Sequence, residues 1–180
     1  MADSIEKQLE KILQTEIKME NGKTLKENLE GAVQYLYQIL DNYIREYYLS
    51  YKPIEYERTF DFMDSLYAEN FLQARVKGNR IELRVSFMDS MANHPNFNHT
   101  HQSYVPILIN SGWYAPKLEK RIGHRINRFT YYEGYHFIEK AIAQFNRQNP
   151  YGVYISSDDV IATWNGQDVH LDFQRKEVIS

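Results

Sequence analysis

Three of the six histidines in this sequence fall within eight residues, in the segment HPNFNHTH over residues 94–101. They are His94, His99 and His101. Neutral imidazoles bind zinc or nickel, and a His-x-His pair on a strand places both rings on the same face. This pattern indicates a metal-dependent enzyme as one candidate function.

The residues around these histidines do not complete a metal site. Zinc centres usually add a carboxylate or a thiolate at a defined spacing, but Asp89 is the one acidic residue in the stretch 88–103 and the chain has no cysteine. The same stretch is rich in Asn, His and Ser, which is typical of a loop. We therefore predict a polar surface loop that binds no metal, and keep the enzyme that uses His94, His99 and His101 as the alternative.

Other catalytic arrangements need a nucleophile with a base, or two carboxylates in a pocket. The acid pairs Asp61 with Asp64 and Asp158 with Asp159 lie in turn-like sequence, where aspartate usually caps a helix or faces water. The sequence contains neither a glycine-rich phosphate loop nor a His-Glu-x-x-His pattern. We therefore predict no catalytic residue and no cofactor.

A basic stretch runs from Lys117 to Arg128 and is flanked by aromatic residues such as Trp113 and Phe129. Basic residues bind the nucleic acid backbone, and aromatic rings stack on bases. The whole chain has a formal net charge of −3, however, whereas nucleic-acid-binding domains usually carry a basic excess. We favour contact between this stretch and an acidic face of another protein, with a nucleic-acid-binding adaptor as a further alternative.

Composition limits the remaining classes of function. A chain of 180 residues with 43% hydrophobic and 25% charged residues is expected to form one globular domain over residues 1–180, with residues 1–22 as a candidate N-terminal helical appendage. The absence of cysteine fits a reducing cytoplasm, and the apolar runs are too short to span a membrane. Fifteen tyrosines suit surfaces that are partly buried by other chains.

Apolar spacing predicts the helices. A long amphipathic helix is expected from Leu25 to near Tyr48, because Thr24 and Glu27 form a capping box at its start. A shorter helix is expected over residues 4–19. A second long one is predicted from about Tyr132 to Arg147, with its inner face formed by Phe137, Ile138, Ala141, Ile142 and Phe145.

Strands are predicted over residues 71–76 and 81–87, joined by a turn at 77–79. Shorter strands are expected at 153–155, 160–164 and 169–173, with a turn at Asn165-Gly166. The stretch 51–66 is expected to be a loop with a short helical turn. Together these elements predict an α+β fold, in which a long amphipathic helix packs on a small antiparallel β-sheet and a second helix lies in the C-terminal half.

Residues 51–59, YKPIEYERT, follow the long helix and precede the predicted hairpin. This order, with the pattern Tyr-x-Pro-x-x-Tyr-x-Arg-Thr, resembles the tail-completion or head–tail joining (neck) proteins of tailed bacteriophages over about residues 25–90. The sequence departs from that family at Phe60, where glycine is common, and at Ser65 and Leu66, which stand in the reverse order.

The resemblance implies a structural virion protein of a phage or prophage. It would be made in the host cytoplasm and would assemble as a ring, commonly sixfold, at the junction between the capsid connector and the tail tube. Its partners would be copies of itself and other neck or tail proteins, without a cofactor, a membrane or nucleic acid. Position and residue type then suggest these interface residues: Tyr51, Tyr56, Arg58, His94, Phe97 and His99.

Overall fold

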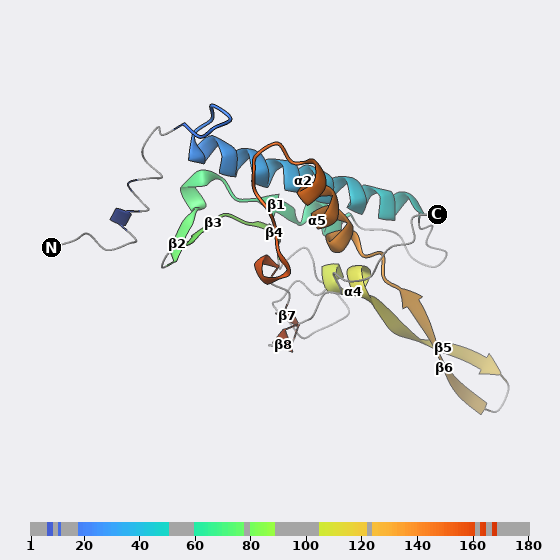
Figure 1. The fold of residues 1–180 in the computed structure, drawn as a ribbon. Helices are drawn as coiled ribbons and strands as arrows, with labels where there is room; N and C mark the ends of the chain where they lie inside the picture. The colour runs from blue at the N-terminus through green and yellow to red at the C-terminus, as the bar shows by residue number, and fades with distance from the viewer. Residues whose placement is uncertain are drawn as a thin grey trace.

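The computed structural model describes residues 7–8, 11, 18–50, 60–77, 80–88, 105–121, 124–160, 163–164 and 167–168 (Figure 1). Of the helix predicted over residues 4–19, positions 7–8 and 11 are helical and positions 18–19 are not. The elements after it, in chain order, are α2 (Leu25–Ser50), α3 (Asp61–Asp64), β1 (Leu66–Ala68), η1 (Phe71–Gln73), β2 (Arg75–Lys77), β3 (Arg80–Glu82), β4 (Val85–Phe87), α4 (Val105–Ser111), β5 (Gly112–Arg121), β6 (His124–Glu133), α5 (Phe137–Gln148), η2 (Ser157–Asp159), β7 (Thr163–Trp164) and β8 (Gln167–Asp168).

Helix α2 begins where the sequence predicts. The Glu27 amide donates to Thr24 Oγ1 at 3.1 Å, and the Thr24 amide donates to Glu27 Oε2 at 2.7 Å, which completes the capping box. These hydrogen bonds to Thr24 lower the pKa of the Glu27 carboxyl. The helix then runs to Ser50, two residues beyond the predicted end, and buries one face that includes Ile39, Leu40 and Ile44.

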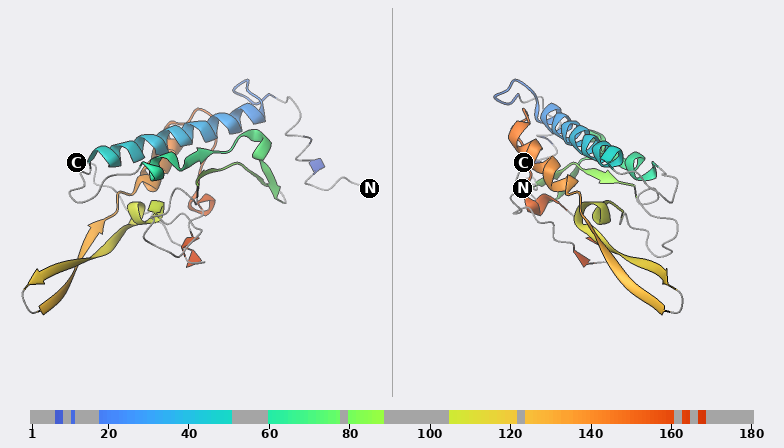
Figure 2. Two further views of the ribbon diagram at one scale, coloured as in Figure 1. Left: turned by 180° about the vertical axis from the view of Figure 1, so that it is seen from behind. Right: turned by 90° about the vertical axis from the view of Figure 1, so that its right-hand side faces the viewer.

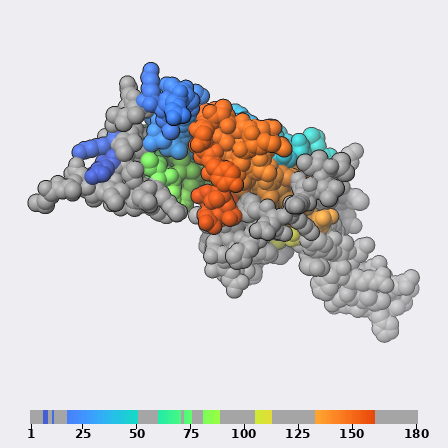
Figure 3. Space-filling model, in the orientation of Figure 1, coloured from blue at the N-terminus to red at the C-terminus, as the bar shows by residue number. Residues whose placement is uncertain are grey.

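The buried face of α2 packs on two elements. One is the antiparallel pair of β1 and β4, in which Leu66 lies opposite Phe87, and the other is α5. Aromatic rings join these elements: the centroid of Phe62 is 5.5 Å from that of Phe87 and 6.0 Å from that of Phe137. The α+β prediction is therefore confirmed. In Figure 3 the orange atoms of α5 lie between the blue start and the cyan end of α2.

The predicted strands 71–76 and 81–87 are partly wrong. Residues 71–73 form the 3₁₀ turn η1 because Asn70 organises it: Leu72 N donates to Asn70 Oδ1 at 3.0 Å, and Asn70 N donates to Gln73 Oε1 at 2.9 Å. Strands β2 and β3 do form the predicted hairpin, with Lys77 paired to Arg80. Strand β1 is not among the predicted strands and begins at Leu66, the last residue of the stretch predicted as loop, in which α3 is the short helical turn expected there.

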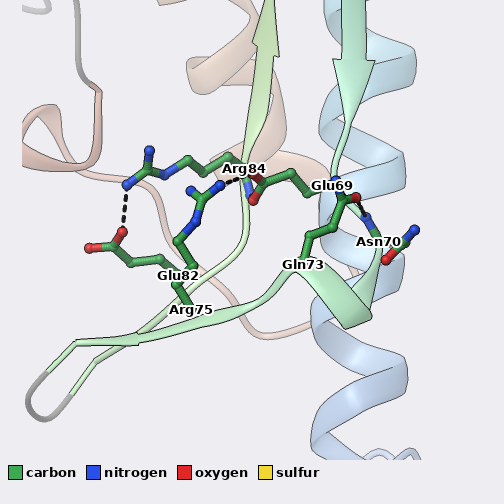
Figure 4. Close-up of polar contacts among 6 residues, drawn as sticks. All are labelled: Glu69, Asn70, Gln73, Arg75, Glu82 and Arg84. Carbon is green, nitrogen blue, oxygen red and sulfur yellow. Dashed lines mark hydrogen bonds and ion pairs between the residues drawn. The ribbon is translucent and has the colours of Figure 1, made fainter.

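The second predicted strand breaks at residues 83–84 because Glu69 bonds to the chain there (Figure 4). Glu69 N donates to Arg84 O at 2.8 Å, and Arg84 N donates to Glu69 Oε2 at 3.0 Å. The other carboxylate oxygen of Glu69, a residue with only 4% of its surface exposed, accepts from Arg75 at 2.8 Å. One buried carboxylate therefore holds the β2–β3 hairpin against the end of the β1–β4 pair.

Helix α5 has the predicted inner face but not the predicted start. Phe137, Ala141, Ile142 and Phe145 are buried and Ile138 is partly buried, whereas residues 124–133 belong to strand β6. The strand expected at 153–155 is absent because Asn146 bonds both backbone groups of Ile155, at 2.8 and 2.9 Å. Residues 163–164 do form a strand, whereas residues 165–166 and 169–173 lie outside the described part of the chain.

Candidate assembly surface at the β5–β6 arm

Strands β5 and β6 form a hairpin, here called the arm (residues 112–133), whose pairing runs from Gly112–Glu133 to Arg121–His124. Figures 1 and 2 show the arm extending away from the body that α2, α5 and the β1–β4 pair make. Within the described residues each strand of the arm pairs only with the other. Among the described residues neither outer edge has a partner strand, and the backbone groups of such an edge can pair with another chain.

The backbone register pairs residues of like type along the arm. Three of the pairs have apolar or aromatic members, and a basic pair lies nearer the tip: Tyr114–Tyr131, Pro116–Phe129, Leu118–Asn127 and Lys120–Arg125. The basic stretch that the sequence singled out covers residues 117–128. These residues form the half of the arm that is farthest from the body.

The base of the arm is held by backbone contacts between the residues that precede β5 and the residues that follow β6. Tyr135 N donates to Ile109 O at 2.8 Å, and His136 N donates to Asn110 O at 3.0 Å. A Cβ added at Gly134 would lie 2.2 Å from Asn110 O and 2.7 Å from Gly112 N. Only glycine therefore permits the chain that follows β6 to pass so close to the end of α4.

Asn110 ties the arm to α5. It is fully buried, and its Oδ1 accepts from Ile138 N, in the first turn of α5, at 2.9 Å. The N-cap residue of α5, His136, has a left-handed φ of 52° and makes no capping hydrogen bond through its side chain, so Asn110 supplies a cap from outside the helix. Among the described residues, Asn110 Nδ2 and Glu139 Oε2 are buried without a hydrogen-bond partner.

Tyr135 ties the arm to α2. Its ring centroid is 5.6 Å from that of Tyr47, and Lys140 Nζ lies 4.2 Å from the same ring centroid. The hydroxyl donates to Glu46 Oε2 at 3.4 Å. Burial, and then the Glu46 charge, raise the pKa of Tyr135, so the phenol stays neutral and remains a donor to that carboxylate.

A second exposed surface lies where α2 ends and α3 begins. Leu49 is 81% exposed and Phe60 is 52% exposed, with the Phe60 ring 5.5 Å from the Tyr48 ring. Asp61 and Asp64, spaced by three residues on α3, are both exposed, and the charge of Asp64 acts on Arg45 of α2.

The sequence predicts that Asp61, Asp64, Asp158 and Asp159 either cap helices or face water. The structure contains examples of both roles. Asp61 and Asp64 are exposed to solvent. Asp159 forms a capping box, because its Oδ2 accepts from both the amide and the hydroxyl of Ser156 at 2.7 Å. These carboxylates act as structural or solvated groups.

The interface and metal residues chosen from the sequence lie outside the described residues. This holds for Tyr51, Tyr56 and Arg58 and for the loop residues His94, Phe97, His99 and His101, so both hypotheses stay predictions. Within the described ranges no three His, Cys, Asp or Glu side chains group as metal ligands would. Sequence reasoning missed the arm as a structure, although the aromatic and β-branched run Phe129-Thr130-Tyr131-Tyr132 is typical of a strand.

Comparison with known proteins found no significant match to a protein-family model, a curated protein or a solved structure. A search of the described residues for a helix long and apolar enough to cross a membrane found none. The case for a function therefore depends on the arm and its anchor.

Proposed function

We propose that this chain is a structural virion protein of a phage or prophage that acts in head–tail joining or tail completion. It works by protein–protein contact, as a subunit of a ring. The observation that supports this most is the arm, whose two outer edges have no partner strand among the residues that the structure describes and whose base is held by backbone hydrogen bonds. The resemblance of residues 25–90 to neck proteins points the same way.

The physics of a hairpin favours an assembly role. An isolated two-stranded hairpin is at best marginally stable in water, and stability normally requires a third strand or packing on another surface. The arm has ten residues in each strand and, over the described residues, no third strand. Contact with another chain would supply the missing packing.

The anchor suits the same role. A closed ring forms only if each subunit presents its contact surface at the same angle to the next. The Gly134–Asn110 contact and the packing of Tyr135 on Tyr47 restrict how the arm leaves the body. The partners proposed are copies of the chain itself, together with proteins of the connector and the tail tube.

Analysis of virions tests the proposal. Mass spectrometry of purified particles from the producing phage or prophage should detect the chain at a low, constant copy number. A nonsense mutation in its coding sequence should leave filled heads and separate tails under the electron microscope, and expression of the chain in trans should restore joined particles. Joined, infectious particles that lack the chain would overturn the proposal.

A further inference from the structure

An Asn-Gly pair, Asn21-Gly22, lies in the turn that precedes helix α2. In such a pair the glycine amide nitrogen can lose its proton, attack the asparagine Cγ and expel ammonia, which closes a succinimide ring. Water then opens the ring to aspartate or isoaspartate. Glycine favours the attack because it has no side chain beside the attacking nitrogen. Both residues are exposed to solvent, so the turn offers the groups and the water that deamidation needs.

Hydrogen bonds in the turn hold both reacting groups. Asn21 Nδ2, the nitrogen that leaves as ammonia, donates to Asn28 Oδ1 at 2.7 Å. Asn21 Oδ1 accepts from Asn28 Nδ2 at 3.2 Å and from Lys23 N at 3.1 Å. Gly22 N, the attacking atom, donates to Met19 O at 2.8 Å. Ring closure therefore requires the turn to open and these bonds to break.

Asn28 is the part of this arrangement that belongs to the body of the molecule. It lies in the first turn of α2 with only 2% of its surface exposed, and its amide N donates to Thr24 O at 3.0 Å. Lys23 N can only donate, so the Asn21 atom that faces it is the oxygen, and Asn21 Nδ2 faces Asn28. We infer that Asn21 is a site of deamidation, and that the buried Asn28 sets the rate of the reaction.

The product no longer fits Asn28. Deamidation replaces Asn21 Nδ2 by an oxygen, which then faces Asn28 Oδ1 as acceptor against acceptor. Rotation of the Asn28 amide would only turn its oxygen toward Met19 Sδ, which now lies 3.1 Å from Nδ2 and has no hydrogen to donate. A buried acceptor that loses its donor is destabilising. Deamidation should therefore loosen the turn from α2.

Peptide mass spectrometry of the full-length chain, incubated at mildly alkaline pH in buffer and in urea, tests the inference. It measures the conversion of amide to acid at Asn21, with Asn165-Gly166 as a reference pair in the same sample. Asn21 of the wild type should convert at least about tenfold more slowly in buffer than in urea, because the folded turn opens only part of the time. Asn28→Ala should raise the rate in buffer about tenfold, since two hydrogen bonds that keep the turn closed are lost. It should leave the rate in urea unchanged.

Two further variants make the result specific to Asn28. Met19→Leu removes the sulfur that Asn28 Nδ2 contacts but keeps both bonds between Asn21 and Asn28, so Asn21 should convert at the wild-type rate. Asn28→Asp has nearly the same shape and still accepts from Asn21 Nδ2, but it cannot donate to Asn21 Oδ1 and should accelerate the reaction several-fold. Circular dichroism checks that each variant is folded, and Asn28→Asp serves if Asn28→Ala does not fold.

Equal rates at Asn21 in the folded wild type and in the folded Asn28 variants would overturn the control by Asn28. A wild-type rate that is the same in buffer as in urea would also do so. Absence of conversion at Asn21 in every folded form, while it proceeds in urea, would overturn the assignment of a deamidation site in the folded chain. None of these outcomes bears on the proposed assembly function, which the virion experiment decides.

Discussion

The close contact at the base of the arm makes Gly134→Ala the sharpest structural test. The added methyl carbon would lie 2.2 Å from Asn110 O, 2.6 Å from Ser111 C and 2.7 Å from Gly112 N. Non-bonded carbon contacts are normally about 3.5 Å or longer, so one of the two backbones must move by about 1 Å. All three obstructing atoms belong to the backbone, which cannot rotate away as a side chain can.

The cost follows from what the shift disrupts. Overpacking of this kind costs about 1–3 kcal/mol. The two backbone hydrogen bonds that join Tyr135 and His136 to the end of α4 contribute about 1 kcal/mol each and would be stretched or lost. We therefore expect Gly134→Ala to lower the free energy of unfolding by about 3–5 kcal/mol, measured by urea denaturation followed by circular dichroism.

Gly31→Ala is the matched control. Its added carbon would lie 2.3 Å from Tyr151 Cε1, an equally short distance, but the obstruction is a half-buried side chain that can rotate. In the interior of a helix such as α2, alanine is about 1 kcal/mol more favourable than glycine, and this gain offsets part of the cost of the contact. This variant should stay within about 1 kcal/mol of the wild type. Equal midpoints for the two variants would refute the argument that backbone contact fixes the base of the arm.

Three further predictions concern side chains that hold the elements together. Asn110→Ala should lower the free energy of unfolding by about 1–3 kcal/mol in the same urea assay, because the first turn of α5 loses a buried acceptor; no loss would contradict the capping role. Glu69→Ala should lower the free energy of unfolding by about 1–3 kcal/mol, because Arg84 N loses its acceptor while the half-exposed Arg75 stays solvated, and no loss would contradict the role of this carboxylate. Thr24→Ala should destabilise the chain at neutral pH, and the difference from the wild type should shrink in acid. The sign follows from Glu27, because the hydrogen bonds from Thr24 lower its pKa below 4.5. The stability that this carboxylate contributes is therefore present above pH 4.5 and is lost as the pH falls through the lowered pKa. A difference between the variant and the wild type that does not change with pH would rule out this coupling.

Local signals account for what the sequence predicts well. The capping box and the apolar spacing of α2 lie within the helix itself, so its start is predictable to the residue. The inner face of α5 is predictable for the same reason. Its start is not, because the aromatic residues before it suit a strand as well as a helix, and pairing with β5 decides between them.

Contacts between distant residues account for what the sequence does not predict. The break between β3 and β4 depends on the carboxylate of Glu69, fifteen residues before Arg84. The anchor of the arm depends on Asn110, which accepts a hydrogen bond from Ile138 N, 28 residues later in the chain. A single polar residue in an apolar run does not indicate such a distant partner. The basic stretch was visible as charge, but its placement on a projecting arm needed the pairing of β5 with β6.

Native mass spectrometry of the purified full-length chain tests the central claim, assembly by protein contact, most directly. It counts subunits and bound metal ions in one spectrum. We predict a closed oligomer of defined subunit number that carries no stoichiometric metal. A monomer at every concentration, with one zinc or nickel ion that is lost in a His99→Ala, His101→Ala variant, would contradict the assembly account and favour the metal-dependent enzyme.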